Sequence, residues 1–517
     1  MYLLKKLKSI LCCCVVLYFL PSYGQETFPK NDISDQRTQA MALTHATIVV
    51  NPETILKDAT LIVRDGIIEA VVPQTQIPNG YREIDLQGKY IYPSFIDMFS
   101  HYGQPKVVIP PRGSPYVKRE QVQSDTKGAY NANEAIKSDY QSAEHFQVDK
   151  KAAEKLRAQG FGTVVTIRPD GIARGTASLV VLGEGNENNM VIKPKAAAHY
   201  SFDKGSSSQD YPVSPMGAIA LLRQTFYDAQ WYATKQQKPF IDLALESFNE
   251  SSNLPQIMEA DGWLTALRAN KISEEFKLNF IIKGGGDEYQ RIEEIKQMNA
   301  PLIIPLNFPS AFDVSDPYLT RKISLTDLKH WELAPSNPAR LEDKGITLAF
   351  TAYPMESSSD FLENLRKSVS YGLSTKKALS ALTTVPASLL KINESLGTLE
   401  KGKLANFIIA DGDLFNKNTV LLENYIKGAR FIINASPDSK MTGEYSLTAG
   451  NLNAVFKLET KNSKYTAQLL LPDGTENKAA FTMDGDLPLL EFEVDDKKYN
   501  LVGWTHTEGE HMVFKGD

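Results

Sequence analysis

A polar cluster at the end of an apolar run is the first place where this sequence could do chemistry. Residues 88–101 pass from a turn into an apolar stretch that ends with Asp97 and His101. Strands buried on both faces have this pattern, and the sites of α/β barrels lie at the C-terminal ends of their strands. A carboxylate and an imidazole in that place could bind a metal ion or transfer a proton. The stretch therefore predicts a buried strand that leads into a site.

Two later apolar runs also end in charged residues. Residues 255–259 lead to Glu259 and Asp261, and residues 279–282 lead to Lys283. Asp97, His101, Glu259 and Asp261 could together form a carboxylate-rich site for Zn, Mn or Ca. Alternatively, Asp97 braces the end of its strand, and Glu259 is solvated or paired with Lys283. Both interpretations stay open at the level of the sequence.

Glycines follow Lys283 directly, at positions 284–286. A glycine-rich turn that leads towards a helix can bind a phosphate through its backbone N–H groups. The spacing matches neither the dinucleotide-binding nor the P-loop pattern. We therefore favour a plain turn between a strand and a helix.

Apolar runs of strand length alternate with segments of helical periodicity through the middle of the chain. This alternation predicts a parallel sheet closed into a TIM-type (β/α)8 barrel, so the fold class is α/β. Residues 102–148 are predicted to form a long loop with one short helix near 133–140. The predicted strands are 163–167, 177–182, 190–192, 255–259, 279–282, 302–306 and 347–351, and the predicted helices are 150–159, 216–233, 264–269, 288–298, 337–344 and 360–371.

The two ends of the chain have the pattern of β structure. Residues 42–50, 60–71 and 83–86 are predicted strands, and Asp65-Gly66 between two apolar runs predicts a tight hairpin turn. Residues 436–517 alternate apolar and polar residues, with Trp504 expected in their core. This segment is predicted to be a C-terminal all-β domain.

Several of these stretches resemble the amidohydrolase superfamily. Residues 88–101 are similar to its first barrel strand, and residues 396–413 are similar to the segment that returns the chain from the barrel to a composite β domain. Residues 211–225 and 360–366 resemble a secreted, imidazolonepropionase-like branch, some members of which carry two such units in tandem. The resemblance covers residues 42–435. It implies a composite β-sandwich from residues 42–90 and 396–435, and a barrel from residues 91–395.

The resemblance also implies a metal centre whose ligands this chain has largely replaced. In the superfamily, two histidines on strand one, a histidine on each of strands five and six and an aspartate on strand eight surround one or two metal ions, sometimes with a modified lysine on strand four. Phe99 replaces the first histidine, Glu259 stands on strand five, Lys283 ends strand six, and Ala352 replaces the aspartate. Only His101 keeps an inherited ligand position.

We therefore expect no metal or other cofactor and assign no catalytic residue with certainty. The candidates at the barrel mouth are Asp97, His101, Glu259, Asp261 and Lys283. If the site has been rebuilt, His101, Glu259 and Asp261 would hold Zn or another divalent ion. The remaining histidines are expected to be structural, although His506 and His511 are close enough in sequence to bind a metal as a surface pair; the others are His45, His145, His199 and His330.

Composition and the N-terminus suggest an exported protein. The formal net charge is −6, and an acidic chain without a basic stripe gives no reason to expect nucleic acid. Residues 1–24 have a lysine-rich start, an apolar run and small residues before a cut, as signal peptides do. All three cysteines lie in that segment, so the mature chain is expected to have no disulfide. We expect a periplasmic or secreted, bacterial-type protein with no membrane span after cleavage.

Three functions are compatible with this sequence. The leading prediction is a catalytically silent unit, a pseudoenzyme, that scaffolds or regulates a related active amidohydrolase or assembles with itself. The first alternative is an active hydrolase of C–N bonds in cyclic amides or peptides, with a rebuilt metal site. The second is a periplasmic module that binds a small molecule, with residues 102–148 as its lid.

Overall fold

The computed structural model describes most of the chain after residue 39. The described residues are 40–73, 77–109, 124, 126–354, 360–434, 441–450, 452–461, 464–484, 487–494, 497–508 and 511–516. The predicted signal segment, residues 1–24, lies outside them. Among the helices of the described residues, none has the length and apolar character needed to cross a membrane.

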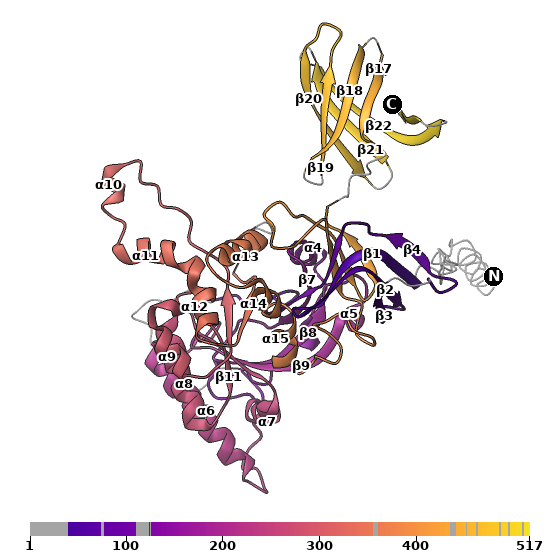
Figure 1. Cartoon of the computed structure of the whole chain (residues 1–517). Helices are drawn as coiled ribbons and strands as arrows, with labels where there is room; N and C mark the ends of the chain where they lie inside the picture. The colour runs from indigo at the N-terminus through magenta and orange to yellow at the C-terminus, as the bar shows by residue number, and fades with distance from the viewer. Residues whose placement is uncertain are drawn as a thin grey trace, which may run out of the picture. The chain divides into compact units, whose positions relative to one another are not determined.

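Strands that precede the barrel in the sequence and strands that follow it form one sheet. The sheet has eight strands, in the order β16-β15-β14-β5-β1-β2-β3, with β4 beside β1; Figure 1 labels its strands β1 to β4. The hydrogen-bonded strands make one sheet, not the two separate sheets of the predicted sandwich. Their bounds are β1 (Ala40–Asn51), β2 (Thr54–Arg64), β3 (Ile67–Pro73), β4 (Arg82–Asp85), β5 (Tyr90–Pro93), β14 (Phe407–Ala410), β15 (Leu421–Ile426) and β16 (Ala429–Ile432).

The predicted hairpin turn is confirmed. Strands β2 and β3 pair antiparallel, with Arg64 opposite Ile67. Asp65 and Gly66 between them have φ values of 51° and 76°, as a tight turn of this kind requires. An added Cβ at Gly66 would lie 2.5 Å from the carbonyl oxygen of Lys427. Only glycine therefore allows the hairpin to approach the turn between β15 and β16.

The second sheet forms the barrel. Its eight strands follow one another in sequence order from β6 to β13. The last strand lies beside the first, since the Thr351 hydroxyl donates a hydrogen bond to the carbonyl oxygen of Phe99 at 2.9 Å. The strands are β6 (Phe95–Ser100), β7 (Phe161–Thr166), β8 (Ala173–Val181), β9 (Val191–Tyr200), β10 (Gln256–Glu259), β11 (Phe280–Lys283), β12 (Leu302–Pro305) and β13 (Leu348–Thr351).

Strand β8 departs from the predicted parallel arrangement. It runs antiparallel to both neighbours, β7 and β9. Residues 167–172 are too short a connection for the crossover that parallel neighbours require, so the chain turns back directly. Both β8 and β9 are also longer than the predicted strands 177–182 and 190–192. As a result, the start of β8 lies at the same mouth as the C-terminal ends of the other barrel strands.

Helices cover the outside of the barrel. The start of α6 follows from the local sequence. Ser214 caps the helix by accepting a hydrogen bond from the Gly217 N–H, and Pro215 stands at the first helical position. Helices α6, α8 and α9 lie along one side (Figure 1), where Arg223 of α6 pairs with Glu275 of α8. The helices are α3 (Ser142–His145), α4 (Lys150–Ala158), α5 (Glu187–Met190), α6 (Pro215–Ala233), α7 (Leu243–Glu250), α8 (Trp263–Phe276), α9 (Ile292–Gln297), α10 (Pro317–Thr320), α11 (Leu325–Leu333), α12 (Asn337–Asp343), α13 (Asp360–Ser370), α14 (Thr375–Ser380) and α15 (Thr384–Leu389).

The predicted helix near residues 133–140 is wrong. These residues form turns, and the first helix after β6 in the described chain is the short α3. The Asn133 side chain accepts a hydrogen bond from the Ala135 N–H, and such a local bond favours a turn over a helix. The Lys137 N–H donates to the Ala173 carbonyl oxygen instead of to a helical partner.

Two apolar layers hold the barrel together. Alternate residues of each strand point to opposite faces, so Val164 packs outwards against the helices and Val165 packs inwards. The inner layer includes Ile96, Met98, Phe99, Val165, Ile257, Ile281, Ile303 and Ala349. The barrel interior is therefore a packed core, and a site can form only at its mouth.

The C-terminal segment is an antiparallel half-barrel, which confirms the predicted all-β domain. Its seven strands pair in sequence order and enclose apolar side chains such as Phe456, Leu469 and Phe492. The side chain of Trp504 lies outside the described part of the structure. The strands are β17 (Gly443–Ala449), β18 (Leu452–Lys461), β19 (Lys464–Leu470), β20 (Glu476–Asp484), β21 (Leu487–Val494), β22 (Lys497–Glu508) and β23 (His511–Gly516).

Candidate functional site

Asp97 ties the first barrel strand to the last. Its side chain is fully buried. Oδ1 accepts a hydrogen bond from the Phe99 N–H at 2.9 Å, and Oδ2 accepts one from the Ala352 N–H at 3.1 Å. Burial raises the pKa of Asp97 to about 6, because the charged form loses its hydration. The carboxylate is thus committed to closing the barrel between β6 and β13.

The titration of Asp97 predicts a pH dependence that an Asp97→Asn variant should lack. With a pKa raised from 3.8 to about 6, the folded chain binds this proton more tightly than the unfolded chain does. Protonation of Asp97 therefore stabilises the fold below pH 3.8, and this contribution is lost as the pH rises through 6. The difference in thermal midpoint, wild type minus Asp97→Asn, should fall over that pH range and stay level above it. A difference that is level throughout would show that Asp97 does not titrate there.

Phe99 fills the centre of the mouth and packs against two imidazoles. Its ring is completely buried, and the ring centroids of His101 and His199 lie 5.5 Å and 5.7 Å away. Tyr353 covers His101 at 4.4 Å. Nε2 of His101 and both ring nitrogens of His199 are buried and have no hydrogen-bond partner among the described residues. The apolar ring of Phe99 therefore occupies the position at which the resemblance implies a metal-binding histidine.

Both imidazoles are held neutral. Burial, with the charges of Arg174 and Lys283, lowers the pKa of His101 to about 3. Burial also lowers the pKa of His199 well below its ordinary value, and Arg174 adds to the shift. An imidazole that stays neutral at any physiological pH cannot supply a proton, so His101 is not a general acid in this arrangement.

A buried ion-pair cluster occupies the mouth beside Phe99. Arg174 Nη1 donates to Glu259 Oε2 at 2.6 Å, and Lys283 Nζ lies 3.7 Å from Glu259 Oε1. Glu259 and Lys283 end the neighbouring strands β10 and β11 in register. Asp261 Oδ1 lies 3.6 Å from Lys283 Nζ, but the Asp261 side chain is 86% exposed. We call Arg174, Glu259 and Lys283 the mouth cluster.

The donor set does not fit the divalent ion that the resemblance implies. The side chains of Arg174 and Lys283 are 3% and 4% exposed, so two buried cations surround the carboxylate of Glu259. A metal ion would have to share that carboxylate with both of them. Nowhere in the described part of the chain do three His, Cys, Asp or Glu side chains converge as a metal site. Of the proposed ligands, Glu259 and Asp261 line one cavity at the mouth and His101 lines another, so the three do not face a common space.

The glycine turn after β11 is filled by the chain's own carboxylate. The N–H groups of Gly285 and Gly286 donate to Glu288 Oε1 at 3.0 Å and 3.1 Å. The Asn337 amide donates to Glu288 Oε2 at 2.6 Å. Burial raises the pKa of Glu288. These backbone donors are therefore not free to hold a phosphate, and the turn is structural.

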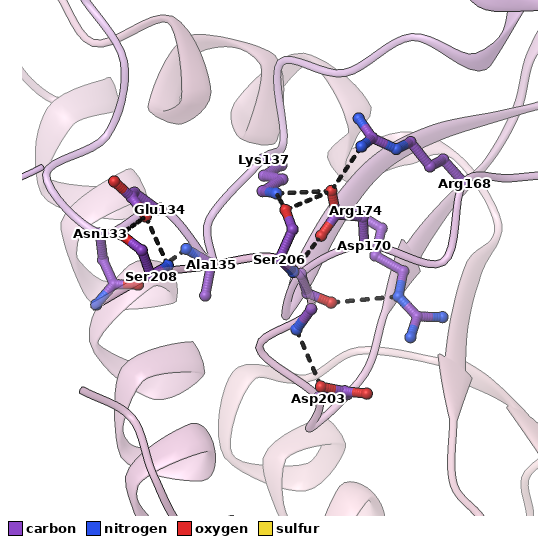
Figure 2. Close-up of polar contacts among 12 residues, drawn as sticks. Asn133, Glu134, Ala135, Lys137, Arg168, Asp170, Arg174, Asp203, Ser206 and Ser208 are labelled. Carbon is purple, nitrogen blue, oxygen red and sulfur yellow. Dashed lines mark hydrogen bonds and ion pairs between the residues drawn. The ribbon is translucent and has the colours of Figure 1, made fainter. Parts of the chain in front are cut away.

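A polar network fixes the loops above the mouth cluster. Figure 2 shows Lys137, Arg168 and Ser206 gathered around Asp170, which we call the Asp170 network. Lys137 Nζ lies 2.7 Å and Arg168 Nη2 lies 3.2 Å from Asp170 Oδ2, and the Ser206 N–H donates to Oδ1 at 2.7 Å. The network joins residues 133–140, the β7–β8 turn and the loop after β9. It holds the turn whose Gly171 carbonyl oxygen accepts from Arg174 Nε.

Gly205 is the residue that allows this loop to approach Asp170. Its φ is +63°, and an added Cβ would clash with Asp170 Oδ1 and Gly171 N. We expect Gly205→Ala to lower the free energy of unfolding by about 2 kcal/mol or more, which combines the left-handed backbone penalty of about 1–2 kcal/mol with the broken network. Gly402→Ala is the matched control, since Gly402 has φ +88° and nothing within 4 Å of the added Cβ. Equal losses in urea titrations of the two variants would contradict the expected clash.

The mouth opens into a cavity of about 650 Å³. All three residues of the mouth cluster line it, together with Phe202 and Tyr353. A neighbouring cavity of about 1130 Å³ shares Tyr353 and is lined by His101. A third cavity, of about 830 Å³, lies within the C-terminal half-barrel and is lined by apolar side chains such as Phe456 and Phe481. Arg174, Glu259 and Lys283 thus face the first cavity, and Asp97 lines the second.

Arg174 and His199 are site residues that the sequence analysis missed. The predicted site residues lie at the C-terminal ends of predicted strands, but Arg174 lies at the start of β8 and reaches the mouth only because that strand is reversed. His199 is predicted to be structural, and it does pack in the barrel; its signal as a site residue is a polar side chain inside the apolar run 196–200. For Arg174, the available signal is its place as the second residue of the segment 173–181, whose other members are uncharged.

Comparisons with known proteins give two family matches. Residues 41–91 match the model of the NagA composite domain, and residues 339–455 match the model of the amidohydrolase family. No curated protein matches the sequence. The first match falls on strands β1 to β5, and the second includes β13 and β14.

Solved structures match the fold over most of the chain. An amidohydrolase from Thermotoga maritima MSB8 is 22% identical, with a TM-score of 0.59, and the match covers 76% of this chain and 100% of that one. A putative prolidase from Bifidobacterium longum is 17% identical, with a TM-score of 0.44, over 76% of this chain and 95% of that one. A Xaa-Pro dipeptidase with bound methionine is 16% identical, with a TM-score of 0.43, over 76% and 100%.

Proposed function

Because the chain belongs to the amidohydrolase superfamily, we propose that it is a member whose metal-dependent hydrolysis of C–N bonds has been lost and whose barrel serves as a non-catalytic unit. The observation that carries this proposal is the mouth cluster. Two buried cations and one carboxylate make a charge-paired group where hydrolysis would need converging metal ligands. Within the cluster, the attraction between opposite charges and the hydrogen bonds offset the cost of burying them, so no metal ion is needed to explain these residues.

The proton-transfer groups support the same proposal. Ala352 has no side-chain base, and both carboxylate oxygens of Asp97 accept backbone hydrogen bonds. Glu259 accepts a hydrogen bond from Arg174 at 2.6 Å, so this oxygen of its carboxylate is already engaged. Activation of a water molecule needs a base within hydrogen-bond reach of that water, and none of these groups meets the requirement.

The test of this proposal is an assay of the purified mature chain with cyclic amides and dipeptides, with and without added Zn²⁺ or Mn²⁺. We expect the same background rate from the wild type and from the His101→Ala/Glu259→Ala variant under every condition. Turnover that the double substitution abolishes would support the rival function, an active hydrolase with a rebuilt site. Circular dichroism of both proteins would ensure that a folded variant is compared.

We further propose that the unit scaffolds or regulates a related active amidohydrolase. Exposed apolar side chains in the last turns of α6 and in the loop after it support an interaction surface: Trp231, Phe240 and Ile241 are 43%, 51% and 67% exposed. Large exposed apolar groups that lie together are typical of protein contacts. Co-expression with a related active chain should give a joint peak in size-exclusion chromatography, and a Trp231→Glu variant should weaken it. A peak of this chain alone at twice its mass would show a homo-oligomer instead.

Export to the periplasm or the medium is the proposed localisation, and residues 1–24 support it by composition alone. Sequencing the N-terminus of the protein from a periplasmic fraction should give Gln25 as the first residue. Recovery of the full chain in the cytoplasm would overturn the proposal.

A further inference from the structure

We infer that the 650 Å³ cavity at the barrel mouth binds a small organic acid, whose carboxylate lies between Lys283 and Arg174. This inference rests on the proposed function, because it assumes that the mouth is a binding site without a metal, and it names the class of ligand. Four observations lead to it: an unsatisfied ammonium, an excess of buried positive charge, the size of the cavity and its apolar wall.

Among the described residues, the ammonium group of Lys283 has no close hydrogen-bond acceptor. Its two carboxylate neighbours, Glu259 and Asp261, lie 3.7 Å and 3.6 Å away, which is beyond the range of a good hydrogen bond. The described residues offer it no closer acceptor. The Lys283 side chain is only 4% exposed, and the aromatic rings of Phe99 and Tyr353 lie 5.5 Å from its nitrogen. A buried charge is costly unless hydrogen bonds satisfy it, so an acceptor from outside the chain would stabilise it.

The buried charges of the mouth cluster do not balance. Arg174 and Lys283 carry two positive charges, and Glu259 carries one negative charge. Asp261 is 86% exposed, so water screens its charge. Arg174 uses Nε on Gly171 and Nη1 on Glu259, while a guanidinium has five N–H donors. One further carboxylate would neutralise the cluster and accept hydrogen bonds from both cations.

The cavity is of the size and character that suit an organic ligand. Its volume lies within the ~300–1,000 Å³ typical of small-molecule sites, and its wall includes Phe202, Pro215, Tyr353 and Pro354 beside the charged groups. A phosphate ion would meet the charges and leave this apolar wall uncovered. An acid with an apolar body would pair with the charged groups and also cover the apolar wall, so the ligand that fits is an organic carboxylate.

Isothermal titration calorimetry of the full mature chain, freed of metal by a chelating resin that is then removed, tests the inference. The probes are acetate, benzoate, phenylacetate, succinate and N-acetylphenylalanine, together with N-acetylphenylalaninamide and inorganic phosphate. We expect at least one apolar acid to bind, and N-acetylphenylalanine to bind about tenfold or more tightly than its amide, the factor that a charge-assisted hydrogen bond provides. Binding of none of the acids, or equal binding of acid and amide, would overturn the inference. So would phosphate binding that matches the best acid.

Substitutions then locate the site. Lys283→Met should weaken the bound acid about tenfold or more, and Lys283→Arg should keep most of the binding, because it keeps the charge. Lys193→Met is the matched control. Lys193 lies near the N-terminal end of β9, at the opposite end of the barrel from the mouth, and its Nζ donates to the Leu390 carbonyl oxygen at 3.1 Å. Equal binding by Lys283→Met and the wild type would overturn the inference. If Lys283→Met does not fold, the comparison of acid with amide on the wild type still decides it.

The metal-free titration separates this inference from the proposed function. Acids that bind to the metal-free chain and lose affinity in Lys283→Met support both. Acids that bind only when a divalent ion is added would indicate a metal-held ligand, and both proposals would then fail. A chain that binds no acid and shows no hydrolysis would overturn this inference alone and leave the proposed function in place.

Discussion

Glu259→Leu should lower the free energy of unfolding by about 3–5 kcal/mol, the largest electrostatic effect that we expect from one substitution in this chain. The change leaves Arg174 and Lys283, which are 3% and 4% exposed, without their shared carboxylate. Two buried charges without a partner are far more costly than an absent ion pair. Urea denaturation followed by circular dichroism would measure the change through the midpoint and slope.

An exposed ion pair provides the control for Glu259→Leu. Arg223 donates two hydrogen bonds to Glu275, at 2.6 Å and 2.7 Å, on the surface of α6 and α8. Glu275→Leu should cost little, because surface pairs contribute little to stability. The double variant Arg174→Met/Glu259→Leu should lose less than the sum of its single changes, since it removes both partners. Strict additivity, or equal losses at Glu259 and Glu275, would contradict a buried mouth cluster.

Phe99→Ala should destabilise the fold by about 3–5 kcal/mol, as truncation of a fully buried phenylalanine typically does. Phe99 is completely buried and contacts the rings of His101, His199 and Tyr353. The deletion would leave a cavity at the top of the barrel core, and the surrounding strands cannot collapse into it. Phe99→Leu keeps most of the volume and should cost less than half as much.

The control for Phe99 is Phe240, which is 51% exposed. Phe240→Ala should cost a small fraction of the loss at Phe99, because little apolar surface is returned to water. Thermal scanning of the three variants would rank them Phe99→Ala, Phe99→Leu and Phe240→Ala from least to most stable. A Phe99→Ala protein as stable as the wild type would show that Phe99 does not plug the mouth.

The parts of the site on parallel strands could be predicted from the sequence. Glu259 and Lys283 each follow an apolar run of strand length, and neighbouring parallel strands end side by side, so their pairing was one of the two interpretations considered. The turn at Asp65 and Gly66 was predictable for a local reason, since two residues with positive φ favour one turn type. Such features can be predicted because each depends only on residues that are close together in the sequence.

The reversal of β8 could not be predicted in the same way. The sequence of residues 173–181 does not give the direction of its strand, because an alternating pattern is the same in either direction and all nine residues are buried. Only the short connection after β7 shows it, and that requires the exact end of β7. Arg174 therefore stayed unnoticed, although it contributes the shortest contact of the mouth cluster. The absent helix at residues 133–140 had a similar cause, since the partner of Lys137 is the distant Ala173.

The metal content of the purified, untagged mature chain after dialysis tests the central claim most directly. Plasma mass spectrometry should find less than about a tenth of an equivalent of Zn, Mn, Fe or Ni, because Arg174 and Lys283 occupy the surroundings of the carboxylate that a Lewis acid would need. About one equivalent of metal, lost in the His101→Ala/Glu259→Ala variant, would contradict the claim and establish a rebuilt metal site at the barrel mouth.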